Sequence, residues 1–214
     1  MRAVLSLLML SALSAAAVPT LSVDARSVDV PTVEAPALVT WRDLSDNPCR
    51  WLGRKVRVRM QFESELADWN PYMTRFGRGQ FDALRGWSDG QFPWIEAEYN
   101  SPEVLFFVRK GSAEQHALDD AATYSRYEFT VVVREVFLDT PWAEIVAVHT
   151  MPEQIREATV IHAARAIDLM EKQAWRLARL ELDVALEAPL PEAAGNELKR
   201  LVEICGKSGD STVK

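Results

Sequence analysis

Residues 55–65, KVRVRMQFESE, decide the fold. Apolar and polar residues alternate along this stretch, so that one face carries Val56, Val58, Met60 and Phe62 and the other carries Arg57, Arg59, Gln61 and Glu63. A period of two residues is typical of a β-strand with one buried and one solvent-facing side. The stretch therefore predicts a long strand and, with it, a domain built mainly of β-structure.

Downstream of this strand the sequence predicts a further set of strands and one helix. After a long connection over residues 66–91, we place strands at residues 92–99, 103–109, 127–138 and 142–148. Residues 112–122 are rich in helix formers, and Ser112 is a suitable N-cap for a helix there. The helix interrupts the strands once, between the third and the fourth.

The order of these elements resembles that of the OB-fold, a five-stranded barrel. The resemblance covers about residues 50 to 150 and rests on element order and length, because no sequence motif carries it. It implies a fold of the mainly β plus α class, with an OB-fold-like barrel over residues 41–150 and a C-terminal helical segment. It also implies that the loop after the first strand, with the faces of strands two and three, forms the ligand platform.

From Pro152 onward the pattern becomes helical, and we assign residues 151–206 to this segment. Its second helix shows the period best, with Leu177, Leu180, Val184 and Ala185 expected on one side. A third helix is expected over residues 192–205, and residues 207–214 are expected to be a disordered tail.

Part of this segment resembles the second half of a tetratricopeptide repeat. The residues that carry the resemblance are Gln173-Ala174-Trp175, Ala178, Ala185-Leu186 and Pro189. They supply an aromatic residue, two small residues seven apart and a proline at the helix end. The first helix lacks a Leu-Gly step, and no second copy follows. A single repeat of this kind would have to pack on the barrel or on a partner.

The N-terminus has the features of a secretory signal over residues 1–17. Arg2 precedes the apolar core VLSLLMLSAL, and Ala15-Ala16-Ala17 offers a cleavage site, with a second at residue 25. Residues 18–40 are expected to form an extended leader. We expect an exported protein, periplasmic or secreted, with no stable membrane insertion of the mature chain. A retained membrane anchor is the alternative.

Export changes how the two cysteines are interpreted. Cys49 and Cys205 are too few for a disulfide scaffold or a four-cysteine metal site. In an oxidising compartment a bridge between them is one interpretation. Two separate buried thiols are the other, because free cysteine behaves as a small apolar residue.

Composition and motifs argue against several functions. The 214 residues are 48% hydrophobic and carry a net charge of -7, so bulk electrostatic binding of nucleic acid is disfavoured. His116, His149 and His162 fall in three separate predicted elements. No metal-binding histidine pair, nucleophile elbow or phosphate-binding glycine loop is present in the sequence. We therefore expect a non-enzymatic protein without a metal or another cofactor.

The connection after the first strand is the candidate ligand surface. Aromatic residues gather over residues 69–99, with arginines between them, and such residues can stack on rings and hold anions. The candidate ligand-binding residues are Arg57, Arg59, Trp69, Tyr72, Arg75, Arg78, Arg85, Trp87 and Trp94. The alternative is that the aromatic residues form a satellite core beneath a long loop.

These observations predict an exported OB-fold-like binding or interaction module. Its partner is expected to be another envelope or secreted protein. A protein that binds an oligosaccharide or oligonucleotide directly is the alternative, with carbohydrate favoured over nucleic acid because of export and net charge. A small exported hydrolase with an unfamiliar site is a third interpretation.

Overall fold

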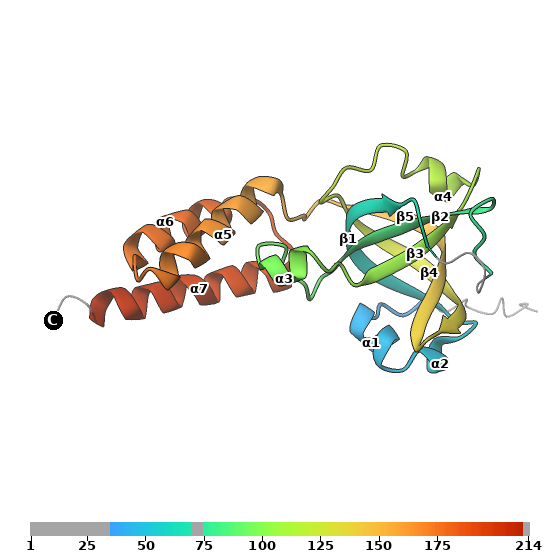
Figure 1. Ribbon diagram of the computed structural model, residues 1–214, viewed down its shortest axis with the longest axis horizontal. Helices are drawn as coiled ribbons and strands as arrows, with labels where there is room; N and C mark the ends of the chain where they lie inside the picture. The colour runs from blue at the N-terminus through green and yellow to red at the C-terminus, as the bar shows by residue number, and fades with distance from the viewer. Residues whose placement is uncertain (1–34, 70–74, 212–214) are drawn as a thin grey trace, which may run out of the picture. The chain divides into compact units, whose positions relative to one another are not determined.

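The computed structural model describes residues 35–69 and 75–211. Five strands form one mixed sheet: β1 (Lys55–Leu66), β2 (Phe81–Ser88), β3 (Val104–Arg109), β4 (Arg126–Phe137) and β5 (Thr140–Met151). Hydrogen bonds close this sheet into a ring in the order β1-β2-β3-β5-β4 (Figure 1). Neighbouring strands are antiparallel, except that β3 and β5 are parallel. The predicted signal peptide lies outside the described residues.

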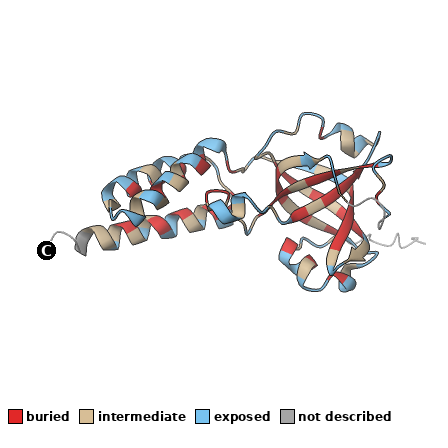
Figure 2. Ribbon diagram, in the orientation of Figure 1, coloured by how far each residue is buried: buried red, intermediate tan, exposed pale blue. Residues whose placement is uncertain are grey.

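The first predicted strand is confirmed as β1. Its apolar residues Val56, Val58 and Met60 are buried inside the ring, whereas Arg57 and Arg59 on the other face are half-buried. Inward residues of the other strands complete this core, and Figure 2 shows the buried positions along the strands. Burial of alternate apolar residues therefore drives closure of the sheet.

The second predicted strand is wrong. Residues 92–99 form a turn and the short helix α3 (Glu96–Tyr99), and the strand is β2, within the segment that we expected to be a loop. β2 does not alternate because both of its faces are covered. Leu84 faces the main core, and Phe81 and Ala83 belong to a second cluster with Phe107 and Trp142.

Gly86 gave β2 the character of a loop, yet the strand requires it. A Cβ at this position would collide with the carbonyl oxygen of Gln61 and the side chain of Met60 on β1. The β1–β2 register also shifts between Phe62 and Ser64, beside the position that pairs with Gly86. The glycine allows close approach of two backbones at this irregularity.

Short helices flank the ring. They are α1 (Trp41–Asp46), α2 (Pro48–Trp51) and α4 (Ala113–His116). Ser112 caps α4 as predicted, but the helix is shorter than the expected range 112–122. The last residues of the expected leader belong to the fold, because Leu38 pairs with Arg57 and Thr40 caps α1.

The C-terminal segment contains α5 (Glu157–Glu171), α6 (Trp175–Ala185) and α7 (Glu192–Ser211), which lie side by side (Figure 1). Of the apolar side expected for α6, only Ala185 is buried. Ala178, Leu182 and Ala185 are buried in the helical core, whereas Leu177, Leu180 and Val184 are exposed. Ala178 and Ala185 permit close helix packing, Leu182 fills the core, and the other three large apolar residues remain outside.

Helix α7 continues past residue 206, where we expected the tail to begin. Gly206, Ser208 and Gly209 are poor helix formers, yet the helix runs through them. Gly209 instead lies against Trp175 of α6. No helix within residues 35–69 and 75–211 is long and apolar enough to cross a membrane.

Both cysteines are free thiols in separate elements. Cys49 is exposed on α2, and Cys205 is buried in the core of the helical segment. Of the two interpretations of the sequence, the structure shows no bridge between the two cysteines, and the description of both thiols as buried fits Cys205 alone. Burial raises the pKa of the Cys205 thiol, which keeps it in its neutral form.

Two buried polar side chains connect the ring to the chain that enters α5. The Gln61 amide donates to the carbonyl oxygens of Tyr124 and Ile155 and accepts the N–H of Ile155. Arg126 donates to the Glu153 carbonyl oxygen at 3.2 Å. Because these groups are removed from water, their hydrogen bonds define how the chain leaves β5.

Candidate functional site

The two tryptophans at the end of the predicted platform are core residues. Trp87 is 1% exposed and lies in stacking contact with the rings of Tyr99 and Tyr124. Its Nε1 donates to the carbonyl oxygens of Glu98 and Tyr99. Trp94 is 4% exposed and stacks on Phe92. Neither ring offers a free face to a ligand.

Trp69 packs over the outer face of β2 and β3. It meets Phe107 edge-on, and its Nε1 donates to the Phe76 carbonyl oxygen at 2.8 Å. Arg78 lies over the Trp69 ring and pairs with Asp68. The face on which the OB-fold resemblance places the ligand is thus covered by this connection, as in the satellite-core alternative.

The other arginines of the predicted platform do not lie against Trp69. The backbone N–H of Arg75 donates to Glu135 at 2.9 Å. Arg85 donates through Nε to Glu63 at 2.8 Å. Burial raises the pKa of the Glu63 carboxyl, but hydrogen bonds from Arg85 and Ser64 outweigh burial and leave the pKa below its ordinary value. Tyr72 lies outside the described residues.

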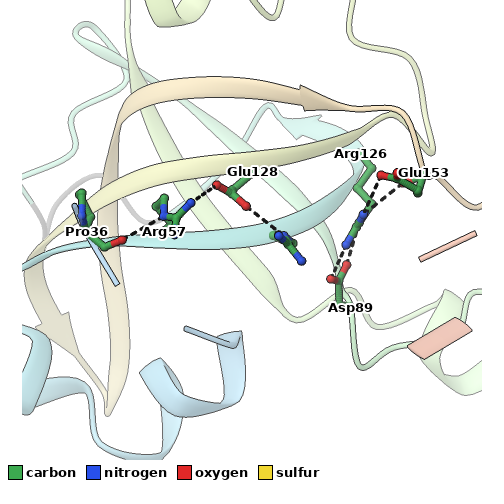
Figure 3. Close-up of polar contacts among 7 residues, drawn as sticks. Pro36, Arg57, Asp89, Arg126, Glu128 and Glu153 are labelled. Carbon is green, nitrogen blue, oxygen red and sulfur yellow. Dashed lines mark hydrogen bonds and ion pairs between the residues drawn. The ribbon is translucent and has the colours of Figure 1, made fainter. Parts of the chain in front are cut away.

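Arg57 and Arg59 share one carboxylate on the outward face of β1 and β4. Arg57 Nη1 lies 2.8 Å and Arg59 Nε 3.0 Å from the two oxygens of Glu128 (Figure 3). Burial raises the pKa of Glu128, but the hydrogen bond from Arg59 and the charge of Arg57 outweigh burial, so the pKa lies below its ordinary value. Arg57 also donates to the Pro36 carbonyl oxygen.

A cavity of about 870 Å³ opens beside Arg59, and we call it the acidic cavity. Its walls come from residues 38–43, Ser45 and Asp46 on one side and residues 88–91, Glu98 and Glu103 on the other. The carboxylates in its lining are Asp43, Asp46, Asp89, Glu98 and Glu103, and the guanidinium groups are Arg42 and Arg59. Carboxylates therefore outnumber cations in the lining.

The α1 wall is held by a capping box. The Thr40 hydroxyl accepts the Asp43 N–H, and the Asp43 carboxylate accepts the Thr40 N–H at 2.9 Å. The Thr40 hydroxyl also donates to the Asp43 carboxylate, and the hydrogen bonds that this carboxylate accepts from the hydroxyl and the N–H of Thr40 lower the pKa of Asp43, so the carboxyl is ionised near neutral pH. Trp41 is buried, and its ring meets Phe106 edge-on inside the main core. This part of the lining is therefore anchored to the ring.

Hydrogen bonds from side chain to backbone fix the opposite wall. Gln91 Oε1 accepts the N–H of Ser88 and of Glu103, and its Nε2 donates to the Ser101 carbonyl oxygen at 2.9 Å. The Ser88 hydroxyl donates to the Glu103 carboxylate. These hydrogen bonds preorganise the wall of the cavity.

Asp89 is held by a buried arginine. Arg126, 3% exposed, donates Nε to Asp89 at 2.9 Å and a second guanidinium nitrogen to the other carboxylate oxygen (Figure 3). Asp89 and Arg59 also line a second cavity, of about 670 Å³, together with Glu153 and Glu192. The two cavities therefore share one charged border.

The part of the chain that the structure describes holds no group of three or more histidine, cysteine or acidic residues placed to bind a metal. His116 pairs with Asp119, and His162 pairs with Glu181 on α6, in different elements. The arrangement near Arg59 suits ionic and hydrogen-bonded recognition.

Sequence reasoning found Arg59 but missed the rest of the acidic cavity. Its acids are spread over several short segments, and no spacing in the sequence relates Asp46 to Glu103. The one available signal was Thr40 followed three residues later by Asp43, which resembles a capping box and predicts ordered chain before α1. A comparison of the chain with protein-family models, curated proteins and solved structures found no match.

Proposed function

We propose that this chain is an exported, non-enzymatic interaction module whose acidic cavity binds a cationic segment of a partner protein. The observation that supports the proposal is the cavity itself, in which ordered carboxylates surround a volume of about 870 Å³. A pocket of this size accommodates a few side chains of a peptide.

The charge of the lining favours a cation. Two unit charges 4 Å apart attract by about 1 kcal/mol in water and by about 4 kcal/mol near a protein surface. Arg126 compensates Asp89, and Glu128 occupies Arg59, so neither of these cavity groups supplies a large free charge. The remaining carboxylates, which include Glu98 and Glu103, exceed the remaining guanidinium group of Arg42.

Apolar groups in the same lining favour a peptide over a simple ion. Leu38, Val39 and Trp41 border the acidic cavity beside the carboxylates. The methylene stems of lysine and arginine pack on apolar surface while their charged ends reach polar groups. A basic peptide segment would satisfy both parts of the lining.

For the scaffold, we propose an OB-fold-like barrel. The closed order β1-β2-β3-β5-β4, with α4 placed between β3 and β4 in the chain, supports this assignment. The outer face of β2 and β3 is covered by Trp69 and its neighbours, so the proposed ligand site differs from the platform that the resemblance implies.

Direct binding of an oligosaccharide is the second candidate. The acceptor-rich lining beside Trp41 is the observation that favours it, because sugar hydroxyl groups donate hydrogen bonds to carboxylates. Binding of a neutral sugar would respond little to salt. Binding of a cationic segment would weaken strongly when salt rises from about 0.1 M to about 1 M, because the Debye length falls from about 10 Å to about 3 Å.

A charge-reversal pull-down tests the proposed function. The mature chain, the variant Asp46→Lys/Glu103→Lys and the control Asp119→Lys/Asp120→Lys are used as bait in envelope extract. Asp46 and Glu103 lie in the cavity lining, whereas the control acids are exposed elsewhere, and both pairs change the net charge equally. Cross-linking with mass spectrometry identifies the partner segment that lies in the cavity.

We expect the cavity variant to lose most of the recovered partner and the control to retain it. The cross-linked segment should be rich in lysine and arginine. Equal recovery with all three baits, or cross-links confined to other surfaces, would contradict the proposal. A recovered partner that high salt does not release would favour the oligosaccharide alternative or another contact.

A further inference from the structure

Helix α6 presents a second apolar face that the described residues leave uncovered. Leu177 is 55%, Leu180 61% and Val184 43% exposed. Their spacing of three and four residues places them on one side of the helix. Ala178 and Leu182, in contrast, are buried against the neighbouring helices. Three large exposed side chains in one row are more than the scattered apolar residues of an ordinary surface.

The charges on α6 are divided between its two halves. Arg176 and Arg179 lie in the N-terminal half, and Glu181 and Asp183 lie in the C-terminal half. Glu181 pairs with His162 of α5. Within the described residues, neither Arg176 nor Asp183 makes an ion pair. By helical geometry both lie along one border of the exposed row, seven residues apart.

We propose that this face binds a second copy of the chain, with the two α6 helices antiparallel about a two-fold axis near Leu180. In that arrangement Leu177 of one copy lies against Val184 of the other. The same symmetry places Arg176 beside Asp183 of the second copy, twice in each dimer, because a two-fold interface is self-complementary. A parallel pairing would instead bring like charges together.

The dimer is expected to be weak and reversible. One helix of 11 residues presents far less than the roughly 800 Å² per partner of a standard stable interface. The exposed apolar row therefore forms the dimer only where the local concentration of the chain is high, for example where a common partner binds several copies. This proposal does not depend on the acidic cavity, which lies on other elements.

Sedimentation equilibrium of the purified mature chain, at concentrations up to about 1 mM, tests the proposal. Leu180→Glu places two like charges beside the axis and is expected to weaken the dimer at least about tenfold. Leu138→Glu is the matched control, because Leu138 is 82% exposed on the β4–β5 turn. The control should dimerise as the wild type does, and circular dichroism should show all three proteins folded.

A charge exchange tests the antiparallel geometry. Arg176→Glu alone and Asp183→Arg alone each create like-charge pairs, so each protein should dimerise less than the wild type. An equimolar mixture of the two variants should form the heterodimer, in which both pairs are attractive again. A wild-type chain that stays monomeric throughout, a Leu180→Glu variant that dimerises unchanged, or a mixture that does not recover would each overturn the proposal.

Discussion

On the outward side of β1 and β4, two arginines and one glutamate neutralise each other's charges. Arg57 and Arg59 both contact Glu128, and the carboxylate is the more buried partner, with 12% of its side chain exposed. A pair of arginines facing solvent looks like an anion site in the sequence. Its cross-strand carboxylate comes from a position 69 residues later than Arg59, so only the folded register reveals that the site is occupied.

The pH dependence of stability should report this contact. Because the folded pKa of Glu128 is below its ordinary value, its contribution is present above the unfolded pKa of about 4.3 and disappears as the pH falls through the folded pKa. We expect Glu128→Gln to cost about 1 kcal/mol at pH 7, a small value because the half-exposed arginines are screened by solvent.

Urea denaturation of wild type and Glu128→Gln at pH 7 and near pH 3 checks this prediction. The difference in the free energy of unfolding should shrink at the lower pH. A difference that is the same at both values would show that the variant acts through packing and not through the carboxylate charge.

Gly86 provides a second prediction at this scale. Gly86→Ala should destabilise the fold by about 1–3 kcal/mol, because the added Cβ meets the backbone carbonyl of Gln61, which cannot rotate away. Gly79→Ala is the control, since nothing lies within 4 Å of a Cβ there. Equal melting temperatures for the two variants would mean that the β1–β2 approach is looser than the structure shows.

The sequence predicts an element correctly where only one of its faces is buried. The prediction fails where both faces of the element are covered. The alternation of β1 identified it correctly, but β2 has apolar contacts on both sides and contains Gly86, so its pattern resembles a loop. In α6 the expected apolar side was right for Ala185 alone, because the helix packs through Ala178, Leu182 and Ala185. The type of a residue predicts whether it is buried only when the elements that pack against it are known.

The aromatic residues and arginines of β2 and of the chain before it allow packing and binding to be tested separately. Trp87→Ala should lower the free energy of unfolding by about 3–5 kcal/mol, because the ring is 1% exposed between Tyr99 and Tyr124. The triple change of Arg75, Arg78 and Arg85 to Gln should cost much less, since exposed ion pairs contribute about 0–1 kcal/mol each.

Denaturation curves of the two variants, measured beside partner recovery, separate packing from binding. Partner recovery should be unchanged in the triple arginine variant. If recovery collapses while stability is retained, these three arginines, and not the acidic cavity, hold the partner.

At the scale of the whole chain, the ring and the helical segment have separate hydrophobic cores. Polar side chains connect the ring to the chain that enters the helical segment. The ring core gathers around residues such as Phe106 and Phe129, and the helical core around Leu182 and Leu198. Arg126 contacts both the loop after β2 and the chain after β5. Sequence could predict the two segments, but not the buried groups that connect them.

Removing Arg126 should therefore weaken the whole fold. Arg126→Met leaves Asp89 without its buried partner, and we expect a loss of about 2–4 kcal/mol. Arg134→Met on the same strand is the control, because Arg134 is exposed and its buried partner Glu144 keeps its ion pair with Arg109, so the loss should cost below about 1 kcal/mol. Thermal unfolding of both variants gives the comparison. Equal losses would contradict a structural role for Arg126.

An NMR titration of the isotope-labelled protein with a short lysine- and arginine-rich peptide tests the central claim most directly. A glutamate-rich peptide and a neutral oligosaccharide serve as parallel probes. We predict that the basic peptide alone shifts the Trp41 indole N–H and the amides of residues 88–91, and that salt reverses the shifts. Shifts confined to Trp69 and residues 75–80, or no shifts with the basic peptide, would contradict the assignment of the acidic cavity as the binding site.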